Sequence, residues 1–324
     1  MSQLLNVSTN PHVLANVTTK SLMRDVILAL LPATIWGVIQ FGPYALLLII
    51  LSIASCVATE YLWNRGFHKE QTIGDLSAVV TGLLLALNLP SGVPFWMPIL
   101  GGVFAILVVK CLFGGLGQNF MNPALAARCF LLISFSGIMT QFPQPRFGAA
   151  STADGVSSAT PLAAIKTAET LGASGQSLKN MFLGLSAGTI GEISALLLIL
   201  GGIYLIARKV ITWDIPVIYI ATVAVFVFLF GQHHFDLTYV MMELCGGGLM
   251  LGAFFMATDY VTSPITPKGR VIYAIAIGVL TGVFRICGNS AEGVSYAIIL
   301  GNVLTPLIER VTIPKAFGRE GKKK

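Results

Sequence analysis

Apolar residues in this chain gather into ten long runs that are separated by short polar connections. The runs cover residues 25–42, 43–63, 73–90, 94–113, 121–139, 186–208, 214–231, 237–257, 271–287 and 292–310. A helix needs about 20 mainly apolar residues to cross the hydrocarbon core of a membrane. Several runs are short or interrupted by Gly and Pro, so nine crossings is an alternative count. The sequence therefore predicts an all-α integral membrane protein with about ten transmembrane helices.

Charged residues are scarce enough to support this class. They make up 10% of the 324 residues, and 55% are hydrophobic, whereas soluble domains carry about 25% charged residues. The net charge of +6 does not indicate a nucleic-acid partner, because the basic residues are scattered between the apolar runs and in the tail GREGKKK instead of forming one basic face. The predicted surroundings are a lipid bilayer.

The distribution of basic residues predicts the orientation. If both termini are cytoplasmic, fifteen of the 20 Lys and Arg residues fall in cytoplasmic segments and four in outer segments, as the positive-inside rule requires. The chain then divides into a cytoplasmic segment 1–24, a transmembrane domain 25–310 and a basic cytoplasmic tail 311–324. The long polar loop 141–185 lies on the outer face. Residues 1–24 lack the apolar stretch of a signal peptide.

Two halves of five helices suggest an internal repeat. The stretch LALNLPSGVPFWMP after the third run resembles MATDYVTSPITPKG after the eighth, in position and in Gly and Pro content. GGLGQNFMNPALAA before the fifth run similarly resembles RICGNSAEGVSYAI before the tenth. An odd number of helices in each half makes the repeats inverted, an arrangement that places binding sites at the repeat interface in many transporters.

The polar loop contains the stretch DGVSSATPLAAIK, residues 154–166. Asp154-Gly155 is a turn signal, and Pro161 is well placed in the first turn of a helix. Thr160 then stands at a helix N-terminus, where a phosphate group is favoured. The alternative is a plain surface loop with a helix cap.

The stretch GGLGQNFMNPALAARC, from Gly114, precedes and enters the fifth run. We expect its glycines to permit close backbone approach and Arg128 to point outward. Asn119 and Asn122 supply amide groups at the helix start, and Pro123 suits a first helical turn. Either this is a tight connection with an Asn cap, or it forms a polar pocket between helices for a ligand or a partner contact. No strand precedes it, so it is not a dinucleotide-binding fingerprint.

Ionisable side chains near or within the apolar runs are costly in a bilayer. Glu60 and Asp75 are expected near the cytoplasmic edge, and Glu243 and Asp259 at opposite ends of the eighth helix, roughly 24 Å apart. The remaining members of this set are Arg128, Glu192 and Arg285.

The five cysteines form no C-x-x-C pair and are expected to be small buried hydrophobes, with one iron–sulfur cysteine shared with a partner as the alternative. His233-His234 makes a poor haem ligand pair, and no metal site is predicted.

The motif D-x-x-S-x-A-T at residues 154–160 resembles the flavinylation motif of the family that contains RnfD of the Rnf electron-transport complex and NqrB of the sodium-pumping NADH:quinone reductase. The N-terminal NPHV (Asn10–Val13), the run Gly114–Phe130 and the helix layout extend the resemblance over essentially the whole chain. It implies that a flavin transferase joins FMN through its phosphate to Thr160, which makes the chain a phosphoprotein. Asp154, Ser157 and Ser158 would shape the recognition loop; Ser158 replaces the family's usual Gly.

The resemblance also implies a function. The chain would be a translocase component in a bacterial cytoplasmic (inner) membrane, part of an ion-translocating ferredoxin:NAD oxidoreductase (Rnf) with other membrane and peripheral subunits as partners. A second, non-covalent flavin (riboflavin or FMN) is expected near Asn119 and Asn122. Length and the short N-terminal segment favour the Rnf type over the quinone-reductase type. A ten-helix transporter or channel without a redox group is the alternative from another class, and no catalytic side chain is predicted.

Overall fold

The computed structural model describes residues 17–147, 157–158, 162, 165–166, 177–232, 235–288 and 293–314. The structure is helical, and one two-stranded antiparallel pair, β1 (Phe142–Pro143) with β2 (Ser157–Ser158), lies in the polar loop. The helices of the first half are α1 (Thr19–Phe41), α2 (Pro43–Gly66), η1 (Ile73–Asp75), α3 (Ser77–Leu87), α4 (Trp96–Val103), η2 (Phe104–Cys111), α5 (Pro123–Ser134) and α6 (Ser136–Met139). Those that follow are α8 (Leu178–Leu183), α9 (Ala195–Ala207), α10 (Asp214–Phe230), α11 (Leu237–Cys245), α12 (Leu249–Leu251), η4 (Gly252–Met256), α13 (Pro267–Cys287) and α14 (Val294–Thr312). The all-α prediction is confirmed.

Each of the ten apolar runs contains a helix. Within the described part of the chain, α1, α2, α13 and α14 are long and apolar enough to cross a membrane alone, and the bent pair α11 and α12–η4 passes the same test as one span. Five shorter apolar helices account for the remaining runs: α3, the continuous α4–η2, α5, α9 and α10. Helix α1 begins at Thr19, before the apolar run, because Thr18 and Ser21 form a capping box around its polar first turn.

Two runs are less regular than predicted. The eighth is bent by 64° between α11 and α12, where Gly247 and Gly248 take φ angles of 63° and 68° that glycine adopts without steric cost. The sixth becomes helical only at α9. Before it, the Ile190 and Gly191 amides donate to the carbonyls of Leu89 and Leu87, at 3.0 and 2.8 Å. This segment, which forms a turn at residues 190–192, covers the C-terminal end of α3. Helix α3 has 11 residues, fewer than a full crossing needs.

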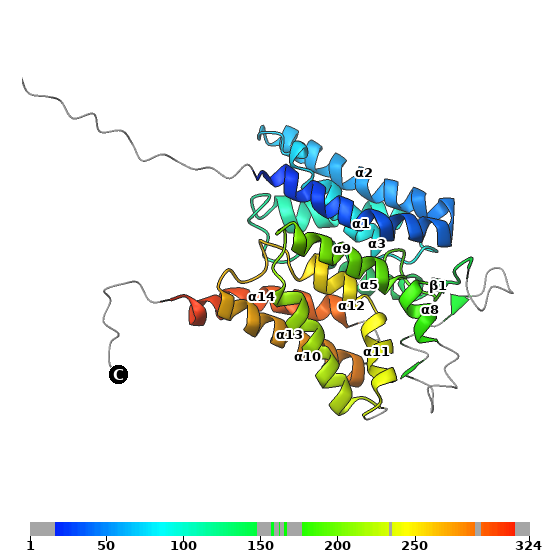
Figure 1. The fold of residues 1–324 in the computed structure, drawn as a ribbon. Helices are drawn as coiled ribbons and strands as arrows, with labels where there is room; N and C mark the ends of the chain where they lie inside the picture. Colours follow the sequence, from blue (N-terminus) through cyan, green and yellow to red (C-terminus); the bar gives the residue numbers. More distant parts are fainter. Residues whose placement is uncertain are drawn as a thin grey trace, which may run out of the picture.

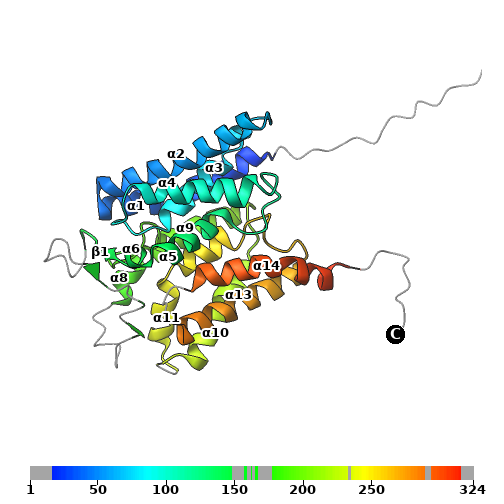
Figure 2. The ribbon, with the colours of Figure 1, turned by 180° about the vertical axis from the view of Figure 1, so that it is seen from behind.

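The packing of the two halves supports the predicted repeat. In the first half α2 packs against α3 and α4, and α4–η2 packs against α5; in the second, α10 packs against α11 and α13, and α13 packs against α14. The halves meet through α1 with α9 and α5 with α14, which are equivalent helices of the two halves. Figures 1 and 2 show the blue and cyan helices of the first half on one side and the yellow-to-red helices of the second half on the other.

The bundle has two distinct ends. Helix α1 begins and α14 ends at the same end, here called the terminal end, whereas β1 and α8 lie at the opposite end, here called the loop end (Figure 1). At the loop end the Arg146 amide donates to the Gln40 carbonyl at 3.0 Å, and the Gln40 side chain donates to the Gly184 carbonyl at 3.2 Å. The two sides of the polar loop are therefore attached to the C-terminal end of α1, opposite the end at which α1 begins.

Candidate functional site

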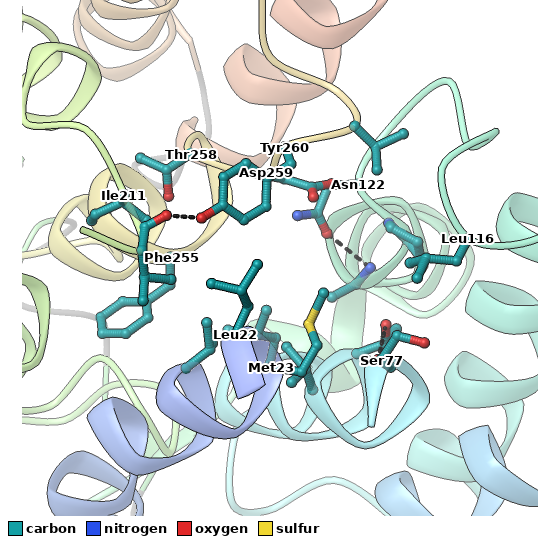
Figure 3. Close-up of a pocket in the computed structure, with 18 of the residues that line it drawn as sticks. Leu22, Met23, Ser77, Leu116, Asn122, Ile211, Phe255, Thr258, Asp259 and Tyr260 are labelled. Atoms are coloured by element: carbon teal, nitrogen blue, oxygen red, sulfur yellow. Dashed lines mark hydrogen bonds between the residues drawn. The ribbon is translucent and has the colours of Figure 1, made fainter. Parts of the chain in front are cut away.

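A cavity at the terminal end lies between the two halves of the molecule. Its walls are apolar side chains from both halves, with polar groups at intervals, and the space between its lining atoms is about 810 Å³, including the part open to the outside. We call it the inter-half cavity. The first half contributes Leu22, Met23, Val26, Ser77, Val80, Thr81, Leu84, Lys110, Leu116, Asn119, Asn122, Pro123 and Ala124, and the second half Leu205, Val210, Ile211, Phe254, Phe255, Thr258, Asp259, Tyr260 and Val261. Figure 3 shows these residues arranged around a common space.

Asn119 and Asn122 both line this cavity. The Asn122 side chain caps α5, because its oxygen accepts from the amides of Ala124 and Leu125 at 3.0 and 3.3 Å. Its nitrogen donates to the Met256 carbonyl of the second half at 3.5 Å. The Asn119 amide nitrogen donates to the Met121 carbonyl at 3.2 Å. Asn122 therefore caps the helix, and both Asn119 and Asn122 also line a cavity, so the two interpretations that the sequence left open do not exclude each other.

The glycines before Asn119 serve the backbone conformation. Gly114, Gly115 and Gly117 have φ angles of 120°, 103° and 90°, which side chains other than hydrogen rarely permit. A Cβ atom on Gly115 or Gly117 would have no neighbour within 4 Å. The prediction that these glycines permit close backbone approach is therefore wrong for these two positions, because it is the turn of the chain that requires them.

Lys110 and Glu60 form a buried ion pair beside the cavity. The Lys110 ammonium lies 2.8 Å from Glu60 Oε2 and the two side chains are 3% and 2% exposed. Lys110 also donates to the Ser77 hydroxyl at 2.6 Å, and the Thr72 hydroxyl donates to Glu60 Oε1 at 2.5 Å. Sequence reasoning placed Glu60 and Lys110 in the cytoplasmic edge region and missed the pair. The signal was present, since Lys110 stands inside the apolar stretch FAILVVKCLF.

A second buried ion pair, between Arg128 and Glu192, joins the two halves. Arg128 of α5 donates to Asn88 Oδ1 at 3.0 Å, to Glu192 Oε1 at 3.1 Å and to the Ser295 hydroxyl of α14 at 3.0 Å. The expectation that Arg128 points outward is therefore wrong. A guanidinium inside the bundle requires these acceptors, because an unpaired buried charge is strongly unfavourable.

A third pair lies at the loop end, at the bend after α11. Arg285 of α13 donates to the Glu243 carboxylate at 3.1 Å and to the carbonyls of Glu243 and Gly246 at 2.5 and 2.9 Å. Arg285 therefore holds the C-terminal carbonyls that α11 leaves unpaired. Asp259 follows η4 at the end of the eighth run and lines the inter-half cavity. Glu243 lies in the last turn of α11, beside the bend inside that run. The prediction that the two residues mark opposite ends of one helix therefore holds for Asp259 and is wrong for Glu243. Burial raises the pKa of the Asp259 carboxyl, while a hydrogen bond from Thr262 opposes the shift.

The flavinylation motif is described only in part. The backbones of Ser157 and Ser158 form β2 and pair with Pro143 and Phe142. Asp154 and Thr160 lie outside the described residues. Leu162 and Ile165, which follow the motif, are buried. The described ranges contain no group of three His, Cys, Asp or Glu residues suited to a metal ion, and His233-His234 falls outside these ranges.

The cysteines match their prediction at four positions. Cys56, Cys111, Cys129 and Cys245 are buried, Cys287 is exposed, and all five are free thiols. The buried four are dispersed over α2, η2, α5 and α11.

Comparison with known proteins assigns the chain to a family. Residues 6–318 match the model of the NQR2, RnfD, RnfE family. The chain is 49% identical over 321 residues to the D subunit of the Na(+)-translocating ferredoxin:NAD(+) oxidoreductase complex of Acetobacterium woodii, covering 97% of this chain and 95% of that protein. It is 43% identical over 322 residues to the D subunit of the proton-translocating ferredoxin:NAD(+) oxidoreductase complex of Clostridium ljungdahlii, covering 97% and 96%. The D subunit of an ion-translocating oxidoreductase complex of Methanosarcina acetivorans is 35% identical over 313 residues, covering 96% of each chain. With a family match and relatives that span nearly the full chain, this protein belongs to the NQR2, RnfD, RnfE family.

Proposed function

We propose that this chain is the flavin-carrying membrane subunit of an ion-translocating ferredoxin:NAD oxidoreductase complex, with FMN attached through its phosphate to Thr160. The single observation that carries the proposal is the motif D-x-x-S-x-A-T in a chain whose full-length relatives are named as the D subunits of such complexes. Their names specify sodium in one case and protons in another, so the proposal covers ion transport without assigning the ion.

The placement of the loop end supports attachment from outside the cytoplasm. The start of α1 and the end of α14 lie at the terminal end, and β1 and α8 lie at the loop end (Figure 1). Strand β2 pairs with β1, and the inter-half cavity is lined by Leu22 and Met23 in the first turns of α1. Basic residues are concentrated in segments at the terminal end, which the positive-inside rule assigns to the cytoplasm. From Met23 to Gln40, α1 rises about 26 Å, close to the thickness of a hydrocarbon core, about 30 Å. The motif and the cavity would then face opposite sides of a bacterial cytoplasmic membrane.

The inter-half cavity is the proposed site of the second, non-covalent flavin (riboflavin or FMN). Leu84, Phe254 and Phe255 supply apolar walls for a flat ring system, and Asn119, Ser77 and Asp259 supply donors and acceptors at its edges. Ligand sites commonly combine such walls with a few convergent polar groups. Electron transfer is the chemistry that a flavin supplies when bound, and these side chains would hold the ring and exclude water from it.

Two alternatives are weaker. A protein of the sodium-pumping quinone-reductase type shares the family, but relatives of 34–49% identity are named as the D subunits of ferredoxin:NAD or ion-translocating oxidoreductase complexes. A transporter or channel without a redox group would use the same helices, yet it leaves the flavinylation motif without a role.

The test is direct detection of the flavin. The chain is produced in cells that contain a flavin transferase, separated on a denaturing gel, viewed under ultraviolet light and digested for peptide mass spectrometry. We expect a fluorescent band and FMN mass on the peptide that contains Thr160. Thr160→Ala should abolish both, while Thr167→Ala, a change in the same polar loop, should preserve both. An unmodified Thr160 beside a labelled control protein would contradict the proposal and leave the transporter as the better interpretation.

A further inference from the structure

We propose that Lys166 is a positioning residue, which together with Leu162 anchors the flavin-bearing segment to the ends of α11 and α13 and so sets where the covalent flavin lies. The inference rests on the proposed function, since it assumes FMN at Thr160. The inference concerns a later step than the attachment of FMN, because Lys166 and Leu162 would position the flavin after it has been attached.

The Lys166 ammonium closes the C-terminal end of α13. It donates to the carbonyl of Arg285 at 2.8 Å and to the carbonyl of Gly288. The last carbonyls of a helix have no partner within the helix, and a cation is stabilised there by the helix dipole. Lys166 is therefore held by a site that the end of α13 offers to a positive charge.

Leu162 fills a notch at the bend of the eighth run. Its side chain is 1% exposed, and it occupies the space that side chains on Gly246 and Gly247 would need. A Cβ atom at these positions would lie 2.3 and 2.8 Å from the Leu162 methyl carbons. The glycines after α11 thus permit both the bend and the close approach of Leu162.

The two contacts belong to one rigid unit. Arg285, whose carbonyl accepts from Lys166, uses its own guanidinium to hold the Glu243 carboxylate and the Gly246 carbonyl. The notch that receives Leu162 and the helix end that receives Lys166 are therefore joined by the Arg285 side chain. An anchor made of buried apolar contact and charge-assisted hydrogen bonds is stronger than either contact alone.

The anchor restricts what is attached to the motif. Thr160 precedes Leu162 by two positions in the chain, and two residues span at most about 7 Å. On the other side, Ser158 is paired through its backbone with Phe142, again two positions from Thr160. A flavin on Thr160 is thus tethered between two fixed points. The rate of electron transfer between two cofactors falls steeply with the distance between them, so the placement of the flavin affects how fast it exchanges electrons with a neighbouring subunit.

The experiment compares Lys166→Met and Leu162→Ala with Lys166→Arg and with Lys179→Met, a lysine on the exposed surface of α8. Covalent flavin is quantified by in-gel fluorescence. The mobility of the flavin is then measured by time-resolved fluorescence anisotropy on the purified full-length chain. Turnover of the assembled complex is expressed per covalent flavin, so that incomplete labelling does not enter the comparison.

We expect Lys166→Met and Leu162→Ala to retain covalent flavin, to raise the amplitude of the fast anisotropy decay, and to lower turnover per flavin. Lys166→Arg, which keeps the charge, should restore both readouts, and Lys179→Met should match the unaltered protein. Unchanged anisotropy and turnover in Lys166→Met would overturn the inference. If Lys166→Met loses its covalent flavin while the unaltered chain keeps it, the inference is also overturned, because Lys166 would then be needed for the attachment of FMN and not for its position afterwards. Absence of flavin from the unaltered chain would instead refute the proposed function.

Discussion

Removal of one partner from the buried pair of Lys110 and Glu60 should destabilise the protein far more than removal of both. The two side chains are 2.8 Å apart and almost fully buried. Lys110→Met leaves the Glu60 carboxylate with one remaining donor, Thr72, and Glu60→Gln leaves the ammonium without its counter-charge. Breaking a buried pair in this way costs about 3–5 kcal/mol, whereas replacing both charges is often nearly neutral.

The expected shift in melting temperature follows from the size of the chain. The entropy of unfolding is about 2.1 cal/mol/K per residue, or about 0.7 kcal/mol/K for a chain of 324 residues. Each single change should therefore lower Tm by about 4–7 °C. The double variant Glu60→Gln with Lys110→Met should lower Tm by less than either single change, which a double-mutant cycle reports as a favourable coupling between the two positions.

The chain offers its own reporters for this measurement. Cys56 and Cys111 are buried near the pair, so a fluorogenic maleimide reacts with them only on unfolding. Exposed Cys287 is first replaced by Ala in every variant, and Lys268→Met on the exposed surface of α13 serves as the matched control. The reasoning is refuted if the single variants melt at the same temperature as the control, or if the double variant melts no higher than the more stable single variant.

Two further changes test the cap and the close helix contact. Asn122→Ala should destabilise the protein by about 1 kcal/mol, because the amides of Ala124 and Leu125 lose their acceptor; Asn122→Asp keeps an acceptor and should retain most of the stability in the same thermal assay. Gly201→Ala places a Cβ atom 2.4 Å from the Ala29 carbonyl of α1, so it should cost about 1–3 kcal/mol. Gly137→Ala, whose Cβ meets no atom within 4 Å, should have little effect, and equal melting of these two alanine variants would contradict the packing described between α1 and α9.

The class of fold and the approximate position of every long helix were predictable from hydropathy. Each run is apolar enough to indicate a helix without knowledge of its neighbours. A backbone that is surrounded by lipid must satisfy its own hydrogen bonds, and a helix does so within one segment. The ends of the helices were less predictable. The bend after Cys245 and the turn at residues 190–192 depend on contacts with α13 and α3, which lie far away in the sequence.

The candidate site was predictable to a similar degree. Asn119 and Asn122 stood out because two amides precede a helix start, and both line the inter-half cavity. The other wall of that cavity comes from residues more than 130 positions later, such as Phe254 and Phe255. No local sequence pattern predicts that these residues line a cavity with Asn119 and Asn122. The buried pairs were missed for the same reason, because each joins residues that lie far apart in the sequence.

The sequence by itself determined the membrane class, the approximate number of helices and the presence of the DGVSSAT motif, because these depend on the local composition of a segment and on the surrounding lipid. The tertiary structure alone decided which charges are paired, where the halves enclose a cavity, and that Lys166 reaches the end of α13. The physical reason is the distance along the sequence over which each interaction acts. Hydrophobic partitioning acts on each segment separately, whereas an ion pair, a helix end that accepts a cation, or a notch that accepts a leucine exists only after distant segments have been packed together.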